Sequence, residues 1–303
     1  MRINKPRPVR IVFILASVLP VFFAAGQAPL ARQAPAAPAP LAVQQISPSL
    51  YLVKGGSGAN AAFYVTPEGV FVIDAKMSAE SAAGMLAKIK EVTAVPVKTL
   101  IITHSDGDHI NGLPGFPKGL RIIAHEKCRA DIAAAAETQP ELRDYIPNKA
   151  YDQPRLEIHA GGTTILLAYF GPAHTSGDTA VLFSKDKAAF LGDLVFVGRD
   201  PVIHRFKGGR SEGCIRTLKA LLEIEPPIET FLSGHADPAG RAEVEVSLAS
   251  IEDLRARVKA MIDEGKTLEE IKKAFGIKDR PAPPSGRYIG RAVEVIYLEF
   301  TER

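Results

Sequence analysis

The stretch VKTLIITHSDGDH, residues 97–109, decides the fold of this chain. Its first half is nearly all apolar, which is typical of a strand covered on both faces of a sheet. Its second half places two histidines and two aspartates within six positions, 104–109. Imidazole and carboxylate groups are metal ligands, and a buried strand that runs into such a cluster is typical of a metallohydrolase. We therefore expect a strand over 97–103 that is followed at once by a metal-binding loop.

Four further segments end an apolar run with a metal-binding side chain. They contain His174 in AHTSGD, Asp193 in LGD, His235 in SGHAD and, with a weaker pattern, Asp74 in VID. Functional side chains on loops are commonly positioned by the rigid elements that precede them. We therefore expect these segments to converge with the 104–109 cluster.

The cluster resembles the His-x-His-x-Asp-His signature of the metallo-β-lactamase superfamily. His174, Asp193 and His235 match the later ligand motifs of that family in order and in character, so the resemblance covers roughly residues 46–240. It implies an α/β fold, the four-layer αββα sandwich of the metallo-β-lactamase type. The chain departs from the signature at Asp106, which stands where the family usually has its second histidine.

The resemblance also implies a dinuclear metal site, with zinc as the metal that suits imidazoles and carboxylates. In such a site, two metals can share one hydroxide that attacks the substrate, and Asp108 is the expected catalytic carboxylate that orients this water. The implied ligands are His104, Asp106 and His174 for the first metal, Asp108, His109 and His235 for the second, and Asp193 as the bridge.

Asp106 and Asp74 leave alternatives open. An anionic Asp106 favours harder cations than an imidazole does. Asp106 therefore allows three outcomes, namely a dinuclear site that it ligates, a single working metal, or iron or manganese in place of zinc. Asp74 is expected to hydrogen-bond a ligand or the metal loop, and the alternative for this residue is a turn cap.

The N-terminus has the pattern of a secretory signal peptide. Four basic residues precede an apolar run over 11–25, and small residues follow the run. We expect a signal peptide over 1–26, an Ala- and Pro-rich disordered linker over 27–45, and a metallo-β-lactamase-like domain with C-terminal helices over 46–303. The protein would then be periplasmic or secreted, with no stable membrane span after cleavage; an uncleaved anchor is the alternative.

The charge balance disfavours nucleic acid as a partner. The chain has 37 basic and 34 acidic residues, and the first 40 residues carry five of the basic and none of the acidic ones. The remaining chain has 32 basic and 34 acidic residues, a net charge of −2. A near-neutral domain lacks the basic surface that nucleic acid requires, so a small-molecule substrate is the expected partner. The oligomeric state does not follow from the sequence.

The hydrophobic pattern alternates strands with helices twice, which favours two sheets that are faced by helices. We expect Ser78 to cap the first helix and Cys128 and Cys214 to be separate buried thiols, although a disulfide stays open. Strands are expected over 50–53, 61–65, 70–73, 97–103, 120–124, 155–159, 163–170, 179–183, 188–191 and 231–232, and helices over 126–138, 214–224, 242–264, 268–274 and 288–299.

The remaining polar residues of interest are interpreted as structural. His125 is expected to be a hydrogen-bonded structural histidine, His159 a surface residue and Asp178 a cap. His204 lies in the segment 197–209 after Asp193. That segment is expected to be a solvated loop, although Arg205 and Lys207 within it and the adjacent Arg210 could instead bind a substrate anion.

We therefore expect an exported metal-dependent hydrolase. Its metal-bound hydroxide would act on an ester, lactone, lactam or related small molecule. An iron-dependent oxidoreductase on the same fold and a non-catalytic metal-binding domain are the alternatives.

Overall fold

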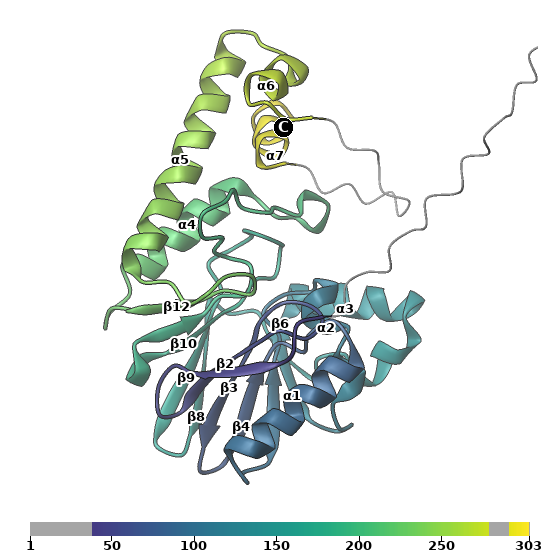
Figure 1. The fold of residues 1–303 in the computed structure, drawn as a ribbon. Coiled ribbons are helices and arrows are strands. Elements are labelled where there is room, and N and C mark those ends of the chain that lie inside the picture. Colours follow the sequence, from purple (N-terminus) through teal and green to yellow (C-terminus); the bar gives the residue numbers. More distant parts are fainter. Residues whose placement is uncertain (1–37, 279–290, 303) are drawn as a thin grey trace, which may run out of the picture. The chain divides into compact units, whose positions relative to one another are not determined.

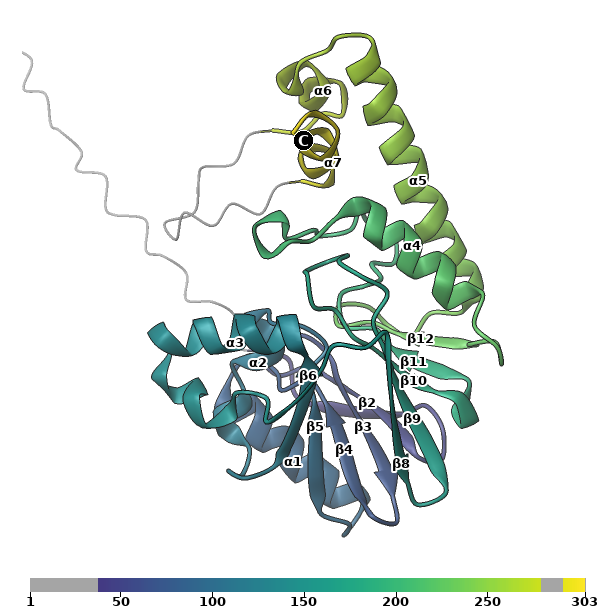
Figure 2. The ribbon, with the colours of Figure 1, turned by 180° about the vertical axis from the view of Figure 1, so that it is seen from behind.

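A computed structural model describes residues 38–278 and 291–302, and these lie in one compact unit that begins at Pro38. Two β-sheets lie face to face, and helices cover the outer face of each sheet (Figures 1 and 2). This arrangement confirms the predicted αββα sandwich. The predicted signal peptide, residues 1–26, lies outside the described residues. In the part of the chain that is described, no helix is long and apolar enough to span a membrane.

The first sheet has seven strands that run in sequence order from β1 to β7. Strands β1 to β4 are antiparallel to their neighbours, and β4 to β7 are parallel. The carboxyl ends of β4, β5 and β6 therefore meet at one edge. The strands are β1 (Ala42–Gln45), β2 (Leu50–Lys54), β3 (Ala61–Thr66), β4 (Gly69–Ile73), β5 (Val97–Ile101), β6 (Arg121–His125) and β7 (Lys149–Tyr151).

The second sheet has five strands in the order β12-β11-β10-β9-β8. Only its β11–β12 pair is parallel, so these two strands end at the same edge. The strands are β8 (Arg155–Ala160), β9 (Thr163–Ala168), β10 (Ala180–Phe183), β11 (Ala188–Phe190) and β12 (Thr230–Leu232).

The helices divide between the two outer faces. On the first sheet, α1 (Ala79–Val92) and α3 (Glu126–Thr138) bury apolar faces, and on the second, α4 (Ser211–Leu222) and α5 (Arg241–Asp263) do so. The last helix, α7 (Ala292–Thr301), packs mainly against α5. The short elements are α2 (Gly107–Ile110), α6 (Leu268–Ala274), η1 (Leu113–Gly115), η2 (Pro140–Tyr145), η3 (Ser184–Asp186) and η4 (Arg205–Lys207). As expected, Ser78 caps α1 by accepting a hydrogen bond from the Ser81 amide.

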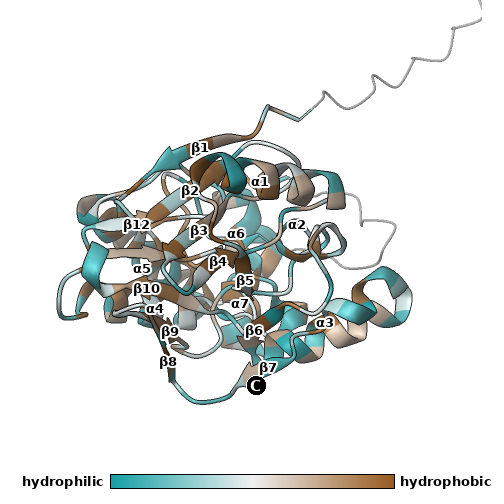
Figure 3. Ribbon diagram, turned by 90° about the horizontal axis from the view of Figure 1, so that it is seen from below, coloured by the Kyte–Doolittle hydropathy of each residue, from teal (hydrophilic) through white to brown (hydrophobic). Residues whose placement is uncertain are grey.

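Apolar residues fill the space between the sheets and beneath the helices. Tyr64, Phe183 and Phe190 are fully or almost fully buried between the two sheets. Figure 3 shows hydrophobic residues concentrated along the strands, with hydrophilic residues frequent on the outer helices. The two cysteines lie in different helices, α3 and α4, and both are buried free thiols. The interpretation as separate thiols is confirmed.

The structure differs from the expected elements in several places, and the short strand β7 was not expected at all. The strand β1 lies inside the segment 27–45 that composition predicts as a disordered linker, because residues 42–45 pair with β2 through backbone hydrogen bonds that composition does not reveal. The strand β5 ends at Ile101 and not at Thr103, since the Thr103 amide donates to the Asp74 side chain. The last helix begins at Ala292, while residues 288–290 of its predicted span lie outside the described residues.

Replacing Val72 by alanine should lower the free energy of unfolding by about 2–3 kcal/mol. Val72 is fully buried in β4, so the substitution removes two methyl groups and leaves a cavity. Urea denaturation followed by circular dichroism measures the change. The matched control is Val246→Ala, because Val246 is 67% exposed and should change stability by no more than about 0.5 kcal/mol. Equal effects of the two substitutions would contradict the assigned core.

Candidate metal centre

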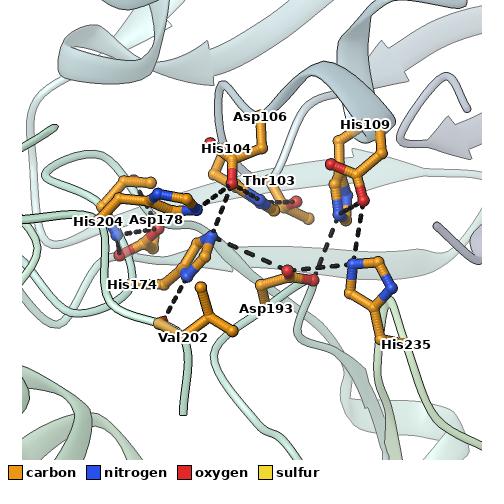
Figure 4. A network of polar contacts seen from close by, with 12 residues as sticks. Thr103, His104, Asp106, His109, His174, Asp178, Asp193, Val202, His204 and His235 are labelled. Carbon is orange, nitrogen blue, oxygen red and sulfur yellow. Dashed lines mark hydrogen bonds and ion pairs between the residues drawn. The ribbon is translucent and has the colours of Figure 1, made fainter. Parts of the chain in front are cut away.

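The residues predicted as metal ligands converge where the strands of both sheets end (Figure 4). From the first sheet, Asp74 follows β4, and the 104–109 loop follows β5. From the second sheet, Asp193 follows β11 and His235 follows β12. His174 comes from the segment between β9 and β10. All seven predicted ligands lie in groups whose candidate ligand atoms are within 4.8 Å of one another.

Asp74 holds the metal loop by three hydrogen bonds. Its Oδ1 accepts from the Thr103 amide at 2.8 Å, and its Oδ2 accepts from the Thr103 hydroxyl at 2.7 Å. Oδ2 also lies 2.7 Å from His109 Nδ1. Asp74 is 1% exposed and has a positive φ of 63°, which aspartate adopts more readily than most residues. These contacts are the ones expected for Asp74 from the sequence.

The hydrogen bonds around Asp74 determine which ring nitrogens face the centre. Because the Asp74 carboxylate accepts, His109 Nδ1 donates to it, and its Nε2, whose lone pair a metal would take, points away from Asp74. The Thr103 hydroxyl donates to Asp74, so it accepts from His104 Nδ1, which lies 3.0 Å away. His104 Nε2 therefore also presents a lone pair. Such hydrogen bonds to the second ring nitrogen are typical of metal-binding histidines.

These inward-facing atoms lack hydrogen-bond partners. Within residues 38–278 and 291–302, His104 Nε2, His109 Nε2 and Asp193 Oδ1 are buried and make no hydrogen bond. His109 Nε2 lies 3.2 Å from Asp193 Oδ1 without the geometry of a hydrogen bond, and although burial opposes it, Asp74 and Asp193 hold the pKa of His109 well above its usual value. Buried polar groups are normally paired, and a shared cation would pair all three. The residues present therefore fit a metal site.

One group of side chains surrounds the position expected for the second metal. His235 Nε2 lies 3.0 Å from Asp108 Oδ2 and 3.2 Å from Asp193 Oδ2. His109 Nε2 lies 3.8 Å from the same Asp108 oxygen. Asp108 and His235 are 28% and 31% exposed at the side chain, whereas His109 is fully buried. This group opens to solvent at Asp108 and His235.

A second group of side chains surrounds Asp106. His174 Nδ1 donates to the Val202 carbonyl at 2.8 Å, and its Nε2 lies at hydrogen-bond distance, 3.0 Å, from Asp106 Oδ2. His104 Nε2 lies 3.8 Å from the same oxygen. Asp193 connects the two groups, because its Oδ2 is 3.8 Å from His174 Nε2 and its Oδ1 faces His109. Asp193 thus lies between the two groups.

The expectation of a solvated loop for 197–209 is wrong at its C-terminal part. His204 is 6% exposed, and its Nε2 lies 2.7 Å from Asp106 Oδ2. Lys207 Nζ lies 2.7 Å from Asp106 Oδ1. Only the fold reveals these contacts, because about a hundred residues separate Asp106 from Lys207. The one signal in the sequence was a histidine and a lysine in a segment that follows a ligand.

Two glycines allow the ligands to approach closely. A Cβ atom on Gly234 would lie 2.5 Å from Asp193 Oδ1 and 2.8 Å from His109 Cε1. A Cβ atom on Gly192, which has a φ of +52°, would lie 2.5 Å from Thr103 Oγ1. The glycine that precedes Asp193 and the one that precedes His235 are therefore required sterically.

The concentration of carboxylates and imidazoles shifts their pKa values. Burial alone would raise the pKa of Asp106, but hydrogen bonds from His174 and His204 hold it well below the usual range. Burial likewise acts against the low pKa of Asp193, which His109 and His235 produce. Both carboxylates stay ionised, which suits them to hold cations.

The pKa values of the imidazoles shift in different directions. Burial opposes protonation of His174, but Asp106 and Asp193 raise its pKa to about 9. Hydrogen bonds that His235 donates to Asp108 and Asp193 raise its pKa to about 9 as well. For His104, burial and the neighbouring His109 and His174 lower the pKa well below the usual value. In the metal-free centre, protons therefore occupy positions between acceptors that a metal would take.

The other polar residues have the structural roles expected of them. Asp178 is buried and accepts hydrogen bonds from the Ala173 and Thr175 amides, which shapes the His174 turn. His125 caps α3 through the Lys127 amide, and burial lowers its pKa to about 4. His159 is exposed. Arg205 pairs with Glu302 and lies outside the centre.

The match to a family model agrees with this fold and site. The model of the metallo-beta-lactamase superfamily matches residues 55–235, which include all seven predicted ligands. The chain belongs to this superfamily. Within it, the motif of this chain is the variant His-x-Asp-x-Asp-His at positions 104–109.

The names of similar proteins indicate several different activities. The chain is 33% identical over 104 residues to the alpha subunit of 2,4-dinitroanisole O-demethylase of Nocardioides sp., covering 34% of this chain and 30% of that one. It is 24% identical over 202 residues to metallo-beta-lactamase type 2 of Elizabethkingia meningoseptica, covering 67% and 78%. It is 24% identical over 214 residues to a linear primary-alkylsulfatase of Pseudomonas sp., covering 71% and 35%. The chain thus spans about a third of the demethylase subunit and of the alkylsulfatase.

Solved structures share the fold at low identity. A metallo-beta-lactamase from Pontibacter korlensis has a TM-score of 0.60 at 19% identity, with 70% of this chain and 99% of that chain covered. A stereoselective inverting sec-alkylsulfatase from Pseudomonas sp. has a TM-score of 0.64 at 17% identity, with 86% and 50% covered. These similarities extend the fold assignment over most of the described chain.

Replacing Asp74 by asparagine should weaken metal retention about 10- to 100-fold, since the second ring nitrogen of His109 loses its charged acceptor. Asparagine tolerates the positive φ at this position, so the fold should survive. Competition with a chromogenic chelator measures the affinity. The control is Asp237→Asn, because Asp237 lies close to His235 in sequence but pairs with Lys54 on the surface. Equal metal affinity of Asp74→Asn and wild type would contradict the role of Asp74.

The metal-free protein should lose stability as the pH rises from about 6.5 to 9. The pKa of His174 and of His235 is raised from 6.5 in the unfolded chain to about 9. Their stabilising contribution is therefore complete below pH 6.5 and is lost through pH 9. Zinc-loaded protein should not show this decline, because metal ligation requires neutral imidazoles. Thermal unfolding after chelation and after zinc addition, between pH 6 and 9.5, tests this difference, which parallel curves would refute.

Proposed function

We propose that the protein is an exported, metal-dependent hydrolase with two metal ions, zinc in the first instance, acting on an ester, lactone, lactam or related small molecule. The observation that carries this proposal is the position of Asp193 between two groups of inward-facing ligand atoms. His104 and His174 lie on one side of Asp193, and His109 and His235 lie on the other. A carboxylate between two cation positions is suited to hold two metals close together.

Two bound ions would supply a Lewis acid and a water nucleophile whose pKa falls from 15.7 to about 7. The protein residues would orient this chemistry. Asp108 stays ionised, because hydrogen bonding from His235 outweighs the effect of burial and lowers its pKa. It is also partly exposed at the mouth of the centre. Asp108 is therefore the carboxylate best placed to accept a hydrogen bond from the attacking water.

A cavity beside the metal loop supports an organic substrate. The cavity measures about 430 Å³ and is lined by Gly107, which lies between Asp106 and Asp108. Ile110, Ala134 and Phe206 contribute apolar surface to it. Phe206 is 46% exposed, and Asn111, Gln139 and Lys207 add polar surface to the lining. We infer that part of the substrate lies here while its reacting bond reaches the metals.

The names of the relatives are consistent with hydrolytic chemistry of this kind but do not select a substrate. They include a β-lactamase, an alkylsulfatase and an O-demethylase subunit. Export is inferred from the N-terminal pattern of a basic segment followed by an apolar run. Export would place the enzyme where small external molecules are its substrates.

Elemental analysis of protein purified without chelator or added metal tests the proposal. Two zinc ions per chain are the expected result. One ion per chain would overturn the dinuclear site, and iron would favour an oxidoreductase on the same fold. Protein that stays metal-free after supplementation with zinc, manganese and iron would overturn the proposal and favour a domain that no longer binds metal.

Replacing Asp108 by asparagine should reduce kcat by at least about 100-fold, the lower range for removal of a positioned proton acceptor. Activity is measured on whichever chromogenic ester, lactone, lactam or sulfate ester the wild type hydrolyses. Thermal unfolding and metal content check that the variant is folded and loaded. Asp144→Asn is the control, because Asp144 pairs with Lys118 on the surface, away from the cavity and the predicted ligands. A loaded Asp108→Asn enzyme with wild-type kcat would overturn the role of Asp108.

A further inference from the structure

We propose that Lys207 is a built-in counter-charge for Asp106, so that Asp106 and Lys207 together present the first metal with the net charge of one neutral imidazole. This inference rests on the proposed function, in which Asp106 is a metal ligand. It assigns a role to a lysine from a distant segment of the chain. Lys207 would be a positioning residue that sets the metal affinity of the centre.

The contacts of Lys207 are those of a group held in a built site. Its Nζ donates to Asp106 Oδ1 at 2.7 Å, to the Ser105 carbonyl at 3.0 Å and to Ser105 Oγ at 3.2 Å. An ammonium group has three donors, so these contacts use its full capacity. The side chains of Lys207 and Asp106 are only 18% and 13% exposed. The pair is therefore poorly screened by solvent.

The two oxygens of Asp106 have different partners. Lys207 binds Oδ1. The other oxygen, Oδ2, faces His104, His174 and His204 (Figure 4). His204 Nε2 is 2.7 Å from Oδ2, which is hydrogen-bond length. The carboxylate is thus fixed in rotation, and one oxygen is directed toward the imidazoles. Without Lys207, either oxygen could turn toward them.

The backbone holds Lys207 against the ligand segment that carries His174. The Ser176 amide donates to the Lys207 carbonyl at 2.9 Å, and the His204 amide donates to the His174 carbonyl at 2.8 Å. The turn η4 is thereby attached to the His174 segment on both sides. The backbone that positions the predicted ligand His174 therefore also positions Lys207 next to Asp106.

The charges of Asp106 and Lys207 predict how Lys207 affects metal binding. An aspartate in place of a neutral histidine adds one negative charge to the first site, and Lys207 adds one positive charge beside it. Lys207 and a bound cation both interact with the same carboxylate, and the two positive charges repel each other. Lys207 should therefore stabilise the metal-free protein and weaken metal binding relative to a bare aspartate. A purely structural lysine would only stabilise the protein.

The experiment measures zinc affinity and metal-free thermal stability in the full chain. Competition with a chromogenic chelator gives the affinity, and the zinc equivalent that is weakened in Asp106→Ala defines the first site. In Lys207→Met, the first site should bind zinc at least tenfold more tightly, and the metal-free protein should unfold at a lower temperature. In the matched control Arg205→Met, which removes a charge from the same turn, zinc affinity should stay within twofold of wild type.

A second pair of variants keeps the inference testable if Lys207→Met does not fold. Asp106→His alone should bind first-site zinc at least tenfold more weakly, since a buried ammonium group then lies beside the site without its counter-charge. Asp106→His combined with Lys207→Met should recover to within threefold of wild type. Such non-additivity is the signature of a direct interaction.

The outcomes separate this inference from the proposed function. Wild-type protein that binds no zinc would overturn both. Wild-type protein that binds two zinc ions, with unchanged or weaker affinity in Lys207→Met, would overturn the inference alone. Wild-type affinity in Asp106→His alone would also overturn it, because the lysine would then need no counter-charge.

Discussion

The buried carboxylate of Asp74 is the interaction on which the metal centre depends. It stands at the end of β4 and binds both the backbone and the hydroxyl of Thr103 and the ring of His109. Through Thr103 it also directs the ring of His104. One carboxylate therefore sets the orientation of two imidazoles, and a group so buried can remain only if all its contacts are made.

The sandwich serves this centre by bringing strand ends together. In each sheet, parallel strands end at one edge, so β4 with β5 and β11 with β12 deliver their following residues to common positions. The apolar layer between the sheets then holds the two edges against each other. The ligands can therefore stand close together although like-charged carboxylates repel one another. Folding supplies the free energy that this crowding requires.

Position 106 carries an aspartate where the family usually has a histidine, and neighbouring side chains compensate for this difference. In sequence, Asp106 looks like a loss of a ligand or a change of metal. In the structure, the carboxylate lies between His204 on one oxygen and Lys207 on the other. The departure from the family motif in the 104–109 loop is thus accompanied by residues from a second segment of the chain, His204 and Lys207. A reading of position 106 alone could not find this compensation.

The short-range patterns of the sequence predicted two sheets faced by helices and most of the strands and helices, because hydrophobic periodicity acts over short stretches. The resemblance of the motifs to the family predicted the four-layer arrangement and the seven residues that converge. It also anticipated Asp74, which ends a strand directly beside the metal loop. Only the tertiary structure decided the pairing of β1, whose backbone partners leave no compositional mark. The same holds for the burial of His204 and Lys207 against Asp106. Those contacts join residues about a hundred positions apart, and only the packing of the two sheets brings them together.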